Sequence, residues 1–109
     1  MEGLYLIHTR EFITTEMPIY KIGRADNLNQ AMVQYPNGSQ FLFISICKNS
    51  KLCEEKILEV FKQKFLQEKY YGNKYYSGDF YEMIDVMNEY ITIYNQQNRE
   101  EDLDLELQN

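Results

Sequence analysis

The chain has 109 residues, the size of one domain, and its 44% hydrophobic and 26% charged residues are typical of a globular protein. No apolar run approaches the roughly 18–20 residues of a membrane helix, and no basic segment followed by an apolar one opens the chain, so neither a membrane span nor a secretory signal is expected. The net charge of −6 argues against strong non-specific DNA binding, although residues 48–74 hold seven Lys and four Glu, a local net charge of +3.

Two short segments near the start predict a β-hairpin. Residues 3–7 and 19–23 both show a partly alternating pattern of β-branched and aromatic residues, which is typical of half-buried strands. The stretch 9–18 between them contains Thr-Thr and a Pro, which stop a strand and turn the chain. The hairpin therefore presents a tyrosine, Tyr5, on one strand and the pair Tyr20 and Lys21 on the other.

A helix and a strongly apolar strand are expected next. Asp26 is a good N-cap, and apolar residues then follow at helical spacing, namely Leu28, Ala31, Met32 and Tyr35. The sequence Pro-Asn-Gly-Ser at 36–39 ends this helix with turn chemistry. Residues 40–47 form the most apolar segment of the chain, and this pattern predicts the central strand of the sheet.

The second half of the chain reads as two helices joined by a tyrosine-rich connector. A helix over 51–68 is followed by the connector 70–76, with four Tyr and a short strand, and a capping-box pattern then opens a helix that ends near residue 95. The acidic segment 96–109 is expected to be a disordered tail. The predicted order is β-β-α-β-α-(β)-α: a single α+β domain over 1–95, with a small, mostly antiparallel three-stranded sheet flanked by helices.

Several short motifs, taken in order, resemble the GIY-YIG nuclease superfamily. The resemblance is to the branch with Lys-Ile-Gly in the second motif, found in phages and nucleocytoplasmic large DNA viruses, and it covers roughly residues 3–92. The motifs that carry it are Gly3-Leu4-Tyr5, Tyr20-Lys21-Ile22-Gly23-Arg24, Asn27-Leu28, the helix from Glu54 to Phe61, Gly72-Asn73-Lys74-Tyr75-Tyr76 and Gly78-Asp79.

This resemblance implies a divalent-metal-dependent DNA endonuclease, with Mg²⁺ or Mn²⁺ as the cofactor. It assigns catalytic roles to Tyr5, which helps to activate water, to Lys21 and to Arg24, and it assigns metal binding to Glu54, with Glu55 as the neighbouring alternative. A cation and a guanidinium suit this chemistry because negative charge builds on the phosphate oxygens.

Two positions depart from the family's charged pattern. In Asn-Leu-x-x-Arg the Arg would fall at position 31, where this chain has Ala31. The acidic residue of the viral Gly-Asn-Glu stretch is Lys74 here. Two alternatives therefore stand beside the nuclease: a catalytically inactive viral module that contacts protein or nucleic acid, and an unrelated α+β interaction protein.

Other readings of the same residues stay open. Arg24 would either hold a phosphate or pair with Asp26 or Glu16, and a carboxylate near a helix N-terminus such as Glu54 is also favoured by the helix dipole.

Tyr20, Lys74 and Tyr75 are candidate nucleic-acid contacts, since aromatic and cationic side chains together bind single strands. The tyrosine-rich segment or the acidic tail would alternatively contact a protein partner, through interface tyrosines or by strand addition. Cys47 and Cys53 are expected to be reduced thiols of an intracellular protein, located in the host cytoplasm or a viral factory if the chain is viral.

Overall fold

The computed structural model describes residues 1–108, with side chains described for residues 1–97. It is an α+β fold, as the sequence predicts. The elements in chain order are β1 (Gly3–His8), α1 (Arg10–Thr14), β2 (Ile19–Ala25), α2 (Leu28–Met32), β3 (Gln40–Ile46), α3 (Ser50–Lys64), β4 (Leu66–Gln67), β5 (Tyr75–Ser77) and α4 (Phe80–Gln108).

All strands lie in one antiparallel sheet of the order β3-β1-β2-β5-β4. The predicted hairpin is present, because β1 pairs with β2 in a register that sets Tyr5 opposite Gly23 and Ile7 opposite Lys21. The sheet has five strands, so the predicted three-stranded sheet is wrong. The short strand expected within 70–76 is present as β5, whereas β4 was not expected, because its two residues are too few for an alternating pattern to be recognised.

The apolar segment expected at the centre of the sheet lies at its edge. β3 pairs with β1 alone, and β2 is the middle strand of the five. One face of β3 is partly open, since Ile44 and Ile46 are 39% and 48% exposed. Hydrophobicity predicts that a segment is a strand but does not specify its neighbours, and for this reason the position was wrong.

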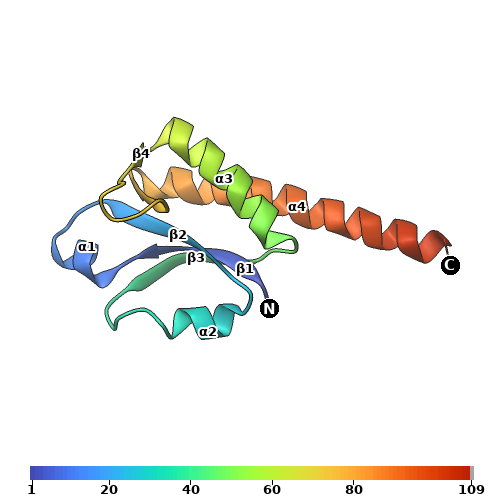
Figure 1. The fold of residues 1–109 in the computed structure, drawn as a ribbon, viewed down its shortest axis with the longest axis horizontal. Helices are drawn as coiled ribbons and strands as arrows, with labels where there is room; N and C mark the ends of the chain where they lie inside the picture. The colour runs from blue at the N-terminus through green and yellow to red at the C-terminus, as the bar shows by residue number, and fades with distance from the viewer. Residues whose placement is uncertain (109) are drawn as a thin grey trace.

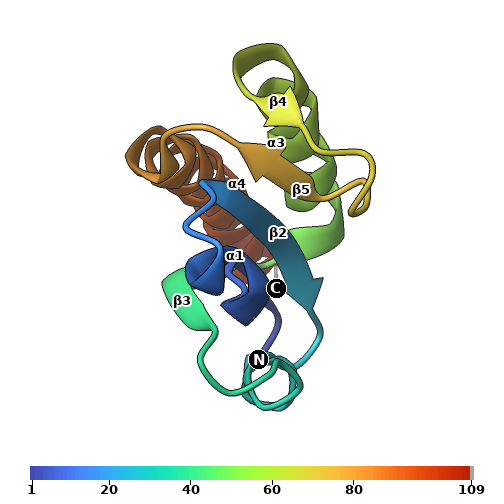
Figure 2. The ribbon, with the colours of Figure 1, turned by 90° about the vertical axis from the view of Figure 1, so that its left-hand side faces the viewer.

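Helices lie on both faces of the sheet (Figure 1). α3 and α4 cover one face, and their buried side chains form the main core with that face, including Leu4, Ile22, Ile57, Phe61 and Met87. The short helix α2 lies on the opposite face, as the end-on view also shows (Figure 2). There a smaller cluster forms around Tyr5, Ile7, Leu28 and Ala31.

Local chemistry explains several element boundaries. The helix α2 is capped by Asn27, one residue after the predicted Asp26, and its side chain accepts hydrogen bonds from the next turn. The stretch before β2 contains the one-turn helix α1, where only a loop was expected. The two cysteines, Cys47 and Cys53, are free and buried.

The last helix continues past the predicted boundary at residue 95. Asn95 anchors it to the sheet, because its side chain donates to the carbonyl of Ile46 at 3.1 Å and accepts from the amide of Lys48 at 3.0 Å. The backbone of α4 then continues to Gln108, where a disordered tail over 96–109 was expected. The Arg, Glu, Leu and Gln residues of this segment are good helix formers, which accounts for the difference. Within the described residues, no helix is both long and apolar enough to cross a membrane.

Candidate functional site

The candidate site is built around the ring of Tyr5, which lies over Gly23 of the neighbouring strand. These two residues are opposite each other in the β1–β2 pairing. A Cβ atom built on Gly23 would lie 2.2 Å from Cζ of Tyr5 and 2.4 Å from two further atoms of that side chain. Only glycine at position 23 therefore allows the phenol to lie across β2.

The Tyr5 hydroxyl is hydrogen-bonded to a second phenol. Its Oη lies 2.7 Å from Oη of Tyr35, and the two rings meet edge to face. Burial raises the pKa of Tyr5, the hydrogen bond with Tyr35 raises it further, and the charges of Lys21 and Lys74 oppose the rise. The phenol is therefore neutral near pH 7 and acts as a hydrogen-bonding group.

The sequence left open whether Tyr20 or Lys21 faces the site, and the structure places Lys21 there. The Lys21 ammonium lies 5.2 Å from the centroid of the Tyr35 ring and 5.7 Å from that of Tyr75. Such cation–π contacts hold a lysine beside aromatic faces while its charge stays available. Tyr20 points to the opposite face, where it is buried against Phe80. It is therefore not placed for nucleic-acid contact.

Glu54 is brought to the same region, but its carboxylate is already paired. Both of its oxygens accept hydrogen bonds from the Lys74 ammonium, at 2.9 and 3.0 Å. Glu54 is only 7% exposed, whereas the Lys74 side chain is 40% exposed. The alternative Glu55 is exposed on α3.

Arg24 lies on the face of β2 that α3 covers, opposite to the face with Tyr5 and Lys21, and it is also paired. Its Nη1 donates to Asp26 at 2.8 Å and to Oγ of Ser50 at 3.3 Å. The hydrogen bond to Asp26 raises the pKa of Arg24, and the nearby charges of Glu54 and Glu2 add to this effect. Of the readings left open for Arg24, pairing with Asp26 is the one the structure contains.

Ala31 occupies the position where the resemblance expects an arginine. It is 8% exposed and packs in the small cluster with Tyr5 and Leu28. Position 31 of α2 thus contributes packing and no positive charge.

The side chains present do not fit the divalent metal that the resemblance implies. A Mg²⁺ or Mn²⁺ ion takes several oxygen ligands, mostly from carboxylates and water. Glu54 offers one carboxylate, and the ammonium of Lys74 is bonded to both of its oxygens. Among the residues that the structure describes, no group of three or more His, Cys, Asp or Glu side chains is arranged to hold a metal ion.

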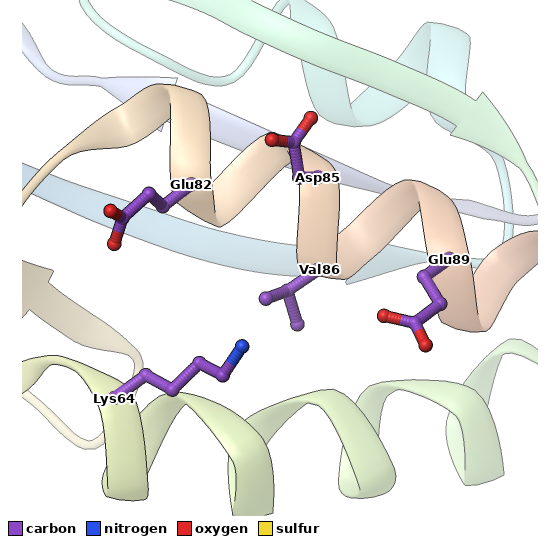
Figure 3. Close-up of a pocket in the computed structure, with 5 residues that line it drawn as sticks. All are labelled: Lys64, Glu82, Asp85, Val86 and Glu89. Atoms are coloured by element: carbon purple, nitrogen blue, oxygen red, sulfur yellow. The ribbon is translucent and has the colours of Figure 1, made fainter.

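A separate acidic groove lies between α3 and α4, away from this site (Figure 3). Its volume is about 460 Å³, and it is lined by Lys64, Glu82, Asp85, Val86 and Glu89. The three carboxylates are distributed along α4 and do not converge on a point, while Lys64 projects from α3 towards them (Figure 3). This groove therefore offers no assembled ligand set.

One member of the site was missed by sequence reasoning. Tyr35 was assigned to the buried face of a helix, but α2 ends at Met32, and Tyr35 lies in the following turn. There it contacts both Tyr5 and Lys21. The Tyr-Pro step at the end of the predicted helix is the only sequence signal for this change.

Comparison of the chain with protein-family models, with curated proteins and with solved structures yields no match. The site must therefore be interpreted from its own geometry and from the resemblance of its motifs.

Proposed function

We propose that this chain is a GIY-YIG-like domain that binds the sugar-phosphate backbone of nucleic acid and has lost the ability to cleave it. The observation that carries the proposal is the ion pair of Glu54 with Lys74. The lysine ammonium bonds both oxygens of the carboxylate that the resemblance assigns to the metal. The Lys74 ammonium thus occupies the position next to Glu54 that the resemblance assigns to the metal.

The loss of cleavage follows from two missing contributions to the transition state. Phosphodiester hydrolysis needs positive groups that face the phosphate as charge develops on its oxygens. The arginine expected on α2 is Ala31, which is buried, and the metal ligand Glu54 is neutralised. Removing one preorganised donor of this kind typically lowers the rate by about 10²–10³, so two losses reduce cleavage below ordinary detection.

Binding is supported by the cations that remain. The charges of Lys21 and Lys74 act on the Tyr5 phenol, and the Lys74 ammonium is paired with Glu54. Lys21 therefore presents a positive charge beside the phenol, within a chain of net charge −6. A phosphate oxygen placed at Lys21 gains a charge-assisted hydrogen bond, and binding of this kind weakens as salt is added.

The first experiment is a nicking assay on supercoiled plasmid with Mg²⁺ or Mn²⁺. We expect no nicking by the folded protein with either ion.

The second experiment measures binding of a fluorescent oligonucleotide in the presence of a chelator. Lys21→Ala should weaken binding several-fold, and Lys62→Ala, which removes an exposed lysine near the end of α3, should not. Binding that is equal in the two variants would contradict the assignment of the phosphate to Lys21.

The second candidate function is the metal-dependent DNA cleavage that the motifs imply. The nearness of Lys74, the partner of Glu54, to the Tyr5 phenol and the nearness of Glu54 to Arg24 favour it. Nicking by the wild-type protein that disappears in Tyr5→Phe and Glu54→Ala would establish this candidate in place of the first. By the same resemblance, we propose that the domain acts inside an infected cell, in the host cytoplasm or a viral factory.

A further inference from the structure

An exposed aromatic surface adjoins the site. We call Tyr70, Tyr71 and Tyr75 the tyrosine platform. Tyr70 is 92% exposed and Tyr71 is 40% exposed. Their ring centroids are 5.1 Å apart, and Tyr71 lies 6.2 Å from Tyr75. Such exposure is unusual for large aromatic side chains, whose burial is otherwise favourable.

The platform is supported from within the domain. The ring of Phe12, on α1, is 3% exposed and meets the Tyr71 ring edge to face at 4.8 Å. The same Phe12 ring lies 6.1 Å from Tyr75. The amide of Tyr71 donates to the carbonyl of Glu68, which closes the turn that carries the tyrosines. The exposed rings of Tyr70 and Tyr71 are thus presented on a turn that contacts with the rest of the domain hold in place.

The platform is continuous with the cationic site. Tyr75 belongs to both, because its ring is one of the two that contact the Lys21 ammonium. Lys74 precedes it in the chain, and its side chain is 40% exposed. A pocket of about 220 Å³ opens beside Tyr75, and its other lining residues are Thr9, Arg10, Glu11, Tyr35 and Pro36. Aromatic faces and positive charges therefore form one connected surface.

We infer that the tyrosine platform stacks the unpaired bases of single-stranded nucleic acid whose backbone lies at Lys21, an inference that rests on the proposed function. Bases in a duplex are stacked on each other and present only their edges in the grooves. Exposed rings such as those of Tyr70 and Tyr71 can stack only on bases that have left a duplex. The combination of a cationic strip with adjacent exposed aromatic rings is the usual arrangement for single strands.

The positive charges favour nucleic acid over a protein partner for this surface. Lys69, which is exposed, precedes Tyr70, and the Lys21 ammonium lies over the Tyr75 ring. The centres of protein interfaces are depleted of lysine, because its desolvation is unfavourable. A polyanion with aromatic bases matches both properties of the surface.

The test compares a labelled oligothymidylate of about a dozen nucleotides with a blunt duplex of equal length, in a chelator at low salt. We expect the single strand to bind more tightly than the duplex. Tyr70→Leu combined with Tyr71→Leu should weaken binding of the single strand by about tenfold or more and change that of the duplex little. Tyr70→Leu alone provides a variant that leaves the fold intact, since its side chain is almost fully exposed.

Tyr81→Leu is the matched control, because this residue is a 68% exposed tyrosine on α4, stacked on Phe80. It should bind both oligonucleotides as the wild type does. Single-strand binding that is unchanged in both platform variants would show that the platform does not stack bases and would overturn the inference, while backbone binding at Lys21 would stand. If the protein binds neither the single strand nor the duplex, the proposed function itself is overturned.

Discussion

Replacing Lys74 by Met tests the ion pair that distinguishes this site. The variant keeps an unbranched side chain of similar length but leaves the Glu54 carboxylate, only 7% exposed, without the ammonium that bonds both of its oxygens. Removing one partner of a fully buried pair costs about 3–5 kcal/mol, and Lys74 is 40% exposed, so water replaces part of the interaction. We therefore expect the free energy of unfolding to fall by about 2 kcal/mol.

Urea unfolding followed by circular dichroism measures this change. Equal slopes of the unfolding free energy against urea concentration in the wild type and the variant indicate that their unfolded states are comparable. The double variant Lys74→Met with Glu54→Leu should regain most of the loss, because no charge is then buried without a partner. Lys56→Met is the control: it removes an exposed pair with Glu59, at 3.5 Å, and should cost less than about 0.5 kcal/mol.

Two results would refute this reasoning. A loss for Lys74→Met no larger than that of Lys56→Met would mean that Glu54 does not depend on its lysine. A double variant that is less stable than Lys74→Met alone would mean that the carboxylate has another stabilising role. In either case the ammonium would not be the reason that Glu54 fails to fit a metal.

Three further predictions concern the tyrosines. Gly23→Ala should lower stability by about 2–3 kcal/mol, because the new Cβ meets the ring of Tyr5, and the loss should be smaller when it is measured in a Tyr5→Ala background. Tyr76→Phe should leave stability unchanged or raise it by up to about 1 kcal/mol. The reason is that the buried hydroxyl of Tyr76 has no hydrogen-bond partner within the described residues. A clear loss of stability in a thermal melt would contradict this prediction. Burial raises the pKa of Tyr5 in the folded state, so this tyrosine ionises first in the unfolded chain. The free energy of unfolding should therefore fall as the pH rises above about 10. The fall should be shallower in Tyr5→Phe, which urea unfolding at several alkaline pH values measures.

Part of the candidate site could be predicted because it depends on local pattern. Alternation along two strands placed Tyr5 on one strand of a hairpin and showed that Tyr20 and Lys21 must face opposite ways. The register that brings Tyr5 opposite Gly23 is known only from the structure, because a long connection with its own helix α1 joins the two strands. The two-residue strand β4 exists because β5, itself paired with β2, offers it an edge, and no periodic signal precedes it.

The sequence by itself determined the α+β class and the hairpin, since both follow from the spacing of neighbouring residues. Only the tertiary structure decided which charges meet. Glu54 on α3 and Lys74 before β5 are separated by 20 positions, and their pairing results from the packing of α3 beside the edge where β5 joins β2. Ion pairs and ring contacts depend on such three-dimensional proximity, and for this reason the residues expected to bind metal and nucleic acid are found bonded to each other.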